Sequence, residues 1–256
     1  MEVWIKINSI EDIKPINCDN KLLFATGLGG FTREYPHYNR KFGEENVTII
    51  KWDETCTDVD SHLQKIKDNI PQDQPFVLSG LSLGGALAIE LLSRETIPNL
   101  QGVILIGSSR KIKQDGGLRF IMKFPWFFLW IFAFFLLLCF PITIFIWRKK
   151  TFDTYKELFR FLRVDGAKKI HKQYNLTLKK LGAADKVLQP EIPILYVGLP
   201  KDVLVDEKDL EFTLKLFKNA KKQLLELNSI HMNEKYDSLI VEKIAEEAEF
   251  IGLVKN

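Results

Sequence analysis

The residues of this sequence best suited to chemistry lie in the run Gly80-Leu81-Ser82-Leu83-Gly84-Gly85. The run fits the pattern G-x-S-x-G, and it stands between an apolar strand-like segment and an apolar helix-like segment. A tight strand-to-helix turn strains the backbone of the serine, and glycines on either side avoid collisions around it. The start of the helix directs free N–H groups toward the place where an oxyanion develops. We therefore predict that Ser82 is a nucleophile on an elbow formed with Gly80 and Gly84.

The elements that must position this serine follow an alternating pattern. Short β-branched and apolar runs alternate with amphipathic segments, which predicts a mostly parallel, twisted sheet with helices on both faces. The strands are expected at Leu22–Thr26, Val47–Trp52, Phe76–Ser79, Gly102–Ile106, Ile194–Val197 and Gln223–Leu227. The helices are expected near Thr32–Lys41, Val59–Asn69, Leu83–Ser93, Glu207–Phe217 and Asn233–Glu249.

The strand, elbow and helix of residues 76–93 resemble the α/β-hydrolase family. In that family an earlier strand is followed by a glycine-containing oxyanion loop, commonly begun by His-Gly. Here the loop reads Thr26-Gly27-Leu28-Gly29-Gly30-Phe31, so Thr26 takes the place of the usual histidine. The resemblance implies that the backbone N–H groups of Leu28 and Leu83 form the oxyanion hole.

The family's chain order of serine, acid and histidine implies the remaining catalytic residues. His231 is the histidine that follows the last predicted strand, whereas His37 and His62 precede the serine and His171 lies in an insertion. The resemblance assigns His231 as the base.

The acid is expected after the strand IPILYV, where the sequence resembles the family's glycine-then-aspartate turn. Asp202 is the matching position. Asp206 is the alternative, although it is better interpreted as the N-cap of the next helix, with Asp209 and Glu211 as solvated acids of its first turn.

A long insertion interrupts the alternating pattern. We expect a catalytic domain formed by residues 1–109 and 191–256, with residues 110–190 as a hydrophobic lid or cap. The run from Pro125 to Trp147 contains no charged residue, and basic residues flank it on both sides. Twelve aromatic residues lie between Phe120 and Trp147.

This apolar run predicts contact with a membrane through residues 118–147. A single crossing would separate Ser82 from Asp202 and His231, so the triad excludes it. Three interpretations remain: a re-entrant hairpin bent near Pro141, an interfacial lid, or a buried lid that lines an acyl pocket. Flanking cations at both ends favour the first two, on the cytoplasmic side of a membrane.

Composition excludes several other classes of protein. The formal net charge of +3 is too small to indicate a nucleic-acid partner. The N-terminus lacks the basic start and long apolar run of a signal peptide. Cys18, Cys56 and Cys139 leave an odd thiol without metal-ligand spacing, so we expect a reducing compartment, no metal and no cofactor.

The resemblance implies a serine hydrolase that cleaves a lipid or long-acyl carboxylic ester through an acyl-enzyme. A thioesterase or acyltransferase with the same triad is the alternative enzyme. A catalytically silent, membrane-associated binding protein is the alternative outside enzymes, since a fold does not by itself imply catalysis. The oligomeric state stays open.

Overall fold

The computed structural model describes residues 13–28, 35–112, 120, 122–138, 166–182, 184–198, 205, 207–218, 222–226 and 234–255. Within these ranges the chain forms one six-stranded sheet in the order β2-β1-β3-β4-β5-β6, and all neighbouring strands run parallel. The strands are β1 (Lys21–Ala25), β2 (Val47–Ile50), β3 (Phe76–Leu81), β4 (Leu100–Ile106), β5 (Ile194–Gly198) and β6 (Lys222–Glu226). Each strand predicted from the sequence is therefore confirmed.

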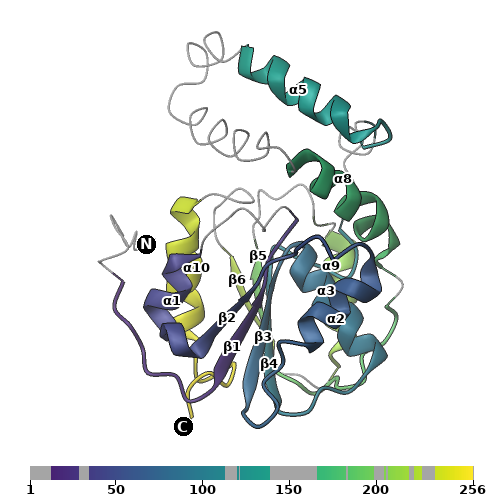
Figure 1. Ribbon diagram of the computed structural model, residues 1–256. Helices are drawn as coiled ribbons and strands as arrows, with labels where there is room; N and C mark the ends of the chain where they lie inside the picture. Colours follow the sequence, from purple (N-terminus) through teal and green to yellow (C-terminus); the bar gives the residue numbers. More distant parts are fainter. Residues whose placement is uncertain are drawn as a thin grey trace.

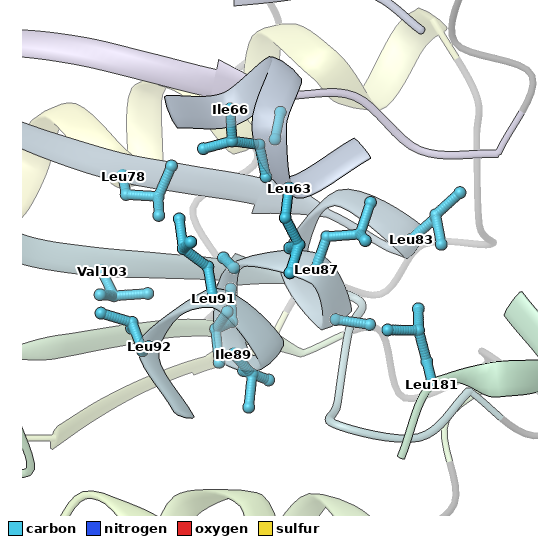
Figure 2. Packing of buried hydrophobic residues seen from close by; sticks show 14 of the residues in the cluster. Leu63, Ile66, Leu78, Leu83, Leu87, Ile89, Leu91, Leu92, Val103 and Leu181 are labelled. Atoms are coloured by element: carbon cyan, nitrogen blue, oxygen red, sulfur yellow. The ribbon is translucent and has the colours of Figure 1, made fainter. Parts of the chain in front are cut away.

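Helices cover both faces of the sheet, as predicted (Figure 1). On one face lie α2 (Val59–Lys67), α3 (Leu83–Arg94) and α9 (Glu207–Leu216), and on the other lie α1 (Pro36–Phe42) and α10 (Glu234–Glu246). The first face is packed by leucine and isoleucine side chains such as Leu63, Leu87 and Leu91, which meet Leu78 and Val103 of the sheet (Figure 2).

The first helix begins four residues later than the sequence predicted. Tyr35, with a φ of −126° and a ψ of 58°, is not helical, and Pro36 is the first helical residue, while residues 29–34 lie outside the described ranges. A proline ring disfavours helical geometry in the residue before it but suits the first position of a helix. The predicted start at Thr32 is therefore wrong, and Pro36 is the physical reason.

The insertion contributes two helices, α5 (Trp126–Leu138) and α8 (Gly166–Leu176), which Figure 1 shows beyond one end of the sheet. Its later part also enters the core of the α3 face, through buried side chains at Tyr174, Leu178 and Leu181. Among the helices of the described residues, none combines the length and the apolar character that a bilayer crossing requires.

Candidate active site

Ser82 occupies a strained turn between β3 and α3. Its φ of 50° and ψ of −113° lie in the left-handed half of backbone space, which residues other than glycine seldom adopt. The Ser82 N–H donates to the Ile106 carbonyl at 2.9 Å, and the Ser82 carbonyl accepts from the Ser108 hydroxyl at 2.6 Å. Contacts on both sides of the residue therefore hold the strained conformation.

The glycines of the elbow allow the chain to pack more closely than any other residue would. A Cβ atom at Gly84 would lie 2.1 Å from the Ala25 carbonyl oxygen of β1, and one at Gly80 would lie 2.4 Å from the Gly85 Cα. Both distances are far below van der Waals contact. Steric crowding thus explains why the elbow has glycine at positions 80 and 84.

The loop after β1 packs directly against the serine. A Cβ atom at Gly27 would lie 3.4 Å from the Ser82 Cβ, so the residue before Leu28 lies close to the side chain of Ser82. Leu28 is half-buried, and Leu83 is the first residue of α3, where backbone N–H groups have no partner within the helix. The structure therefore brings the segment before Leu28 close to Ser82, which Leu83 follows directly.

Thr26, which stands at the position of the family's histidine, holds this loop against the neighbouring strand. Its hydroxyl donates to the Ile50 carbonyl at 2.9 Å, and its own carbonyl accepts from the indole N–H of Trp52 at 2.9 Å. Both partners are buried. Thr26 thus braces the start of the loop through β2 without a histidine.

A buried histidine continues this chain of contacts toward the insertion. The His62 ring lies 4.9 Å from the Trp52 ring, and its Nδ1 lies 2.6 Å from the Asp58 carbonyl oxygen, to which it donates. The Nε2 atom of His62 is buried and has no hydrogen-bond partner among the residues that the structure describes. Burial lowers the pKa of His62, because a charged imidazolium would lose its hydration there.

This burial predicts that His62 makes stability depend on pH. The folded-state pKa is lowered, so the unfolded chain binds more protons, and stability is complete above about pH 6.5. Stability should fall as the pH drops below that value, by at most about 1.4 kcal/mol per pH unit. Urea unfolding of the wild type and of His62→Gln, at pH 8 and at pH 5.5, measures this dependence of the free energy of unfolding on pH.

At pH 8, the difference in the free energy of unfolding between the wild type and His62→Gln reports the packing that the substitution removes. The change in this difference between pH 8 and pH 5.5 reports protonation of His62. The wild type should lose more stability than His62→Gln over this range. Equal losses would show that protonation of other groups carries the dependence.

Arg110, which sequence reasoning did not single out, ties the insertion to α9. Its guanidinium donates to Asp209 at 3.1 Å and to the Ala184 carbonyl at 2.9 Å, and it lies 3.9 Å over the Phe212 ring. Asp209 also accepts from the backbone N–H of Lys111 at 2.9 Å. Arg110, at the start of the insertion, therefore contacts both Ala184 near the end of the insertion and Asp209 of α9.

These contacts correct the prediction for the first turn of α9. Asp209 is not a solvated acid, because its side chain is 12% exposed and paired with Arg110. Glu211 is exposed and pairs only with Lys215 one turn later, as expected of a solvated residue. The sequence offered no signal for this difference, since Arg110 and Asp209 are distant along the chain.

Asp202, Asp206 and His231 lie outside the described residues. Their neighbouring strands are described, and these place the carboxyl ends of β5 and β6 at the same edge of the sheet as the end of β3. Asp202 follows β5 by four residues and His231 follows β6 by five. Both assignments remain predictions.

Comparisons with known proteins point to one fold. Residues 40–142, which include the elbow, match the model of the serine aminopeptidase S33 family. No curated protein sequence matches the chain.

Solved structures resemble the chain over nearly its full length. A lipase-esterase related protein from Clostridium acetobutylicum is 16% identical with a TM-score of 0.59, over 93% of this chain and 97% of that one. A putative non-heme bromoperoxidase from Mycobacterium tuberculosis is 13% identical with a TM-score of 0.60, over 96% and 99%. The RedJ thioesterase from Streptomyces coelicolor is 12% identical with a TM-score of 0.58, over 90% and 86%.

Proposed function

We propose that this chain, whose fold is that of the α/β hydrolases, is a serine hydrolase of carboxylic esters. The observation that carries the proposal is the geometry of Ser82, a non-glycine residue held at a φ of 50° at the start of α3. Backbone strain of this kind persists where the surrounding structure enforces it, and it is concentrated at functional sites. The packed glycines and the hydrogen bonds of Ser82 supply that enforcement.

In the proposed reaction the Ser82 hydroxyl attacks the carbonyl carbon of the ester, and His231 takes the hydroxyl proton. The N–H groups of Leu28 and Leu83 stabilise the oxyanion of the tetrahedral intermediate. His231 then returns the proton to the departing alcohol, which leaves an acyl-enzyme. Water, deprotonated by the same histidine, releases the acid, while Asp202 maintains the tautomer of the imidazole.

Sheet topology supports a meeting of these three residues. The ends of β3 and β6 are separated by three strand spacings, or about 14 Å. The five residues from the end of β6 to His231 can span up to roughly 17 Å when extended. The chain is therefore long enough to bring His231 to Ser82.

Labelling with a fluorophosphonate probe tests the proposal. The wild type should form a covalent adduct at Ser82, and Ser82→Ala should form none, because the probe reacts with an activated serine hydroxyl. Ser93→Ala is the matched control, since Ser93 lies on the same helix and its hydroxyl donates to the Glu90 carbonyl. A folded wild type that does not react would support the catalytically silent alternative.

The alternative enzyme is a thioesterase, and the resemblance in fold to the RedJ thioesterase is the observation that favours this alternative. An oxoester and a thioester with the same acyl chain distinguish the two, when kcat/KM is compared for each. A thioester is intrinsically more reactive than an oxoester. A kcat/KM ratio in favour of the thioester that exceeds this intrinsic difference would favour the thioesterase.

We further propose that the substrate is a lipid or a long-acyl ester and that the enzyme associates with the cytoplasmic side of a membrane. Support comes from α5, which carries exposed aromatic side chains such as Trp126, Phe127 and Phe135. Exposed apolar patches of this kind mark surfaces that bind a membrane or another protein. A helix of 13 residues is about 20 Å long and so suits a position within the interface.

A further inference from the structure

A basic segment of the insertion lies beside the apolar helix. Residues 166–182, which form α8 and the 3₁₀ turn after it, contain five lysines and no carboxylate residue. Three of these lysines, at positions 168, 169 and 172, line a pocket of about 360 Å³. The other wall is the loop after β2, with Asp53, Glu54 and Cys56.

The acidic residues of this pocket already have cationic partners. Asp53 accepts from Lys65 at 2.7 Å, and that hydrogen bond holds the pKa of Asp53 well below its usual range. Glu54 pairs with Lys169 at 3.3 Å. Lys168 and Lys172 are exposed, and neither forms an ion pair with another described residue. Among the described residues, the pocket thus retains two lysines that are paired with no carboxylate.

The remaining walls are suited to a compact polar group. Gln173 is buried and lines the pocket, and Cys56 is buried beside Asp53. Burial raises the pKa of the Cys56 thiol, which keeps it neutral. A group that binds here therefore meets lysine ammonium groups and no unpaired anion, which is the environment that a phosphate prefers.

The helix α8, whose lysines line the pocket, also contacts α5 (Figure 1). The Asn175 side-chain amide of α8 donates to the Met122 carbonyl, just before α5, at 3.1 Å. Met122 is buried, and Leu129 of α5 packs against the core. One helix is therefore rich in lysine, and the helix beside it is apolar.

The exposed side chains of α5 lie on the side away from the core. At 3.6 residues per turn they occupy an arc of roughly 200°, and Leu129 lies nearly opposite the centre of that arc. Their exposed fractions run from 38% at Ile131 to 60% at Phe135. The set comprises Trp126, Phe127, Phe128, Trp130, Ile131, Phe134, Phe135 and Leu138.

We propose that the pocket between residues 53–56 and 168–173 binds the phosphate of an anionic phospholipid headgroup while the exposed face of α5 enters the membrane interface. This inference rests on the proposed membrane association. Charge complementarity supports a lipid phosphate, because Lys168 and Lys172 belong to α8, which contacts α5, and the exposed face of α5 would lie among the acyl chains. The two Trp residues of α5 suit the headgroup level.

Vesicle co-sedimentation of Ser82→Ala protein tests the site without turnover of the lipid. Vesicles of phosphatidylcholine alone are compared with vesicles that also contain phosphatidylglycerol. In this background Lys168→Gln/Lys172→Gln should bind the anionic vesicles about 30-fold more weakly, since each lysine near the surface contributes roughly fivefold. Binding to the neutral vesicles should not change.

The matched control is Lys14→Gln/Lys255→Gln, which removes the same charge at exposed positions outside the insertion. It should bind both kinds of vesicle as the parent protein does. An equal loss in the control would overturn the site, because net charge alone would then explain the binding. Unchanged binding of Lys168→Gln/Lys172→Gln to anionic vesicles would also overturn it.

A second variant tests the apolar face. Replacement of Phe127, Phe128, Phe134 and Phe135 by serine should weaken binding to both kinds of vesicle, with circular dichroism as the check on folding. If that variant binds both as the parent does, or unfolds, α5 is not the inserted element and the proposal fails.

Inorganic phosphate at constant ionic strength distinguishes the source of the anion. If phosphate binds the parent protein through Lys168 and Lys172 while vesicles do not bind, the pocket serves a soluble phosphorylated ligand and the lipid proposal is overturned. Probe labelling of the Ser82-containing protein is read separately. If the protein with Ser82 is not labelled but vesicle binding is intact, the result contradicts the proposed hydrolase and leaves the phosphate site standing.

Discussion

Alanine at Ser82 and alanine at His231 are each expected to lower kcat/KM by at least ~10⁴-fold, and the double variant should be hardly slower than either. The reason is that the proposed serine and histidine act as one unit: without the base the hydroxyl is a weak nucleophile, and without the hydroxyl the base has no proton to take. Steady-state kinetics with a long-acyl p-nitrophenyl ester measures the three variants.

Matched controls separate catalysis from folding. Ser93→Ala and His171→Ala change the same residue types on α3 and α8, and both should retain activity close to the wild type. All five proteins should unfold within a few degrees of one another. Losses at Ser82 and His231 that multiply in the double variant would show that the two residues act independently, contrary to the assignment.

Asparagine at Asp202 is expected to lower kcat by about 10⁴-fold with little change in substrate binding. An amide at this position would stabilise the wrong imidazole tautomer and would not support the positive charge that develops on His231. The carboxylate and the amide have nearly the same shape, so the fold should be unaffected. Stopped-flow measurement of the acyl-enzyme burst separates binding from the chemical step.

Asp206→Asn is the control for this assignment. The helix α9 begins at Glu207, so residue 206 stands immediately before its first turn, at the position of an N-cap. Asparagine caps helices about as well as aspartate, and the change should cost no more than about 1 kcal/mol of stability and leave kcat intact. A strong loss of kcat at Asp206 with a mild effect at Asp202 would move the acid to Asp206.

The sequence by itself determined the sheet and the elbow. All six strands lie where apolar and β-branched runs predicted them, because strand-forming patterns are local and the inner strands β1, β3 and β5 are buried on both faces of a parallel sheet. The G-x-S-x-G pattern likewise predicted the turn at Ser82, since Gly80 must approach Gly85 within the same turn, although the need for glycine at position 84 comes from Ala25 of β1. The assignments of Asp202 and His231 came from the family's chain order and still await experiment.

Tertiary structure alone decided how distant segments brace one another. Thr26 hydrogen-bonds to β2, Arg110 joins both ends of the insertion to Asp209, and the pocket forms between the loop after β2 and α8. In each case the partners are far apart in the chain, and no local pattern encodes their meeting. The interpretation of Asp209 as solvated was wrong for this reason: its burial depends on a cation about a hundred residues away, which only the folded chain brings within hydrogen-bonding distance.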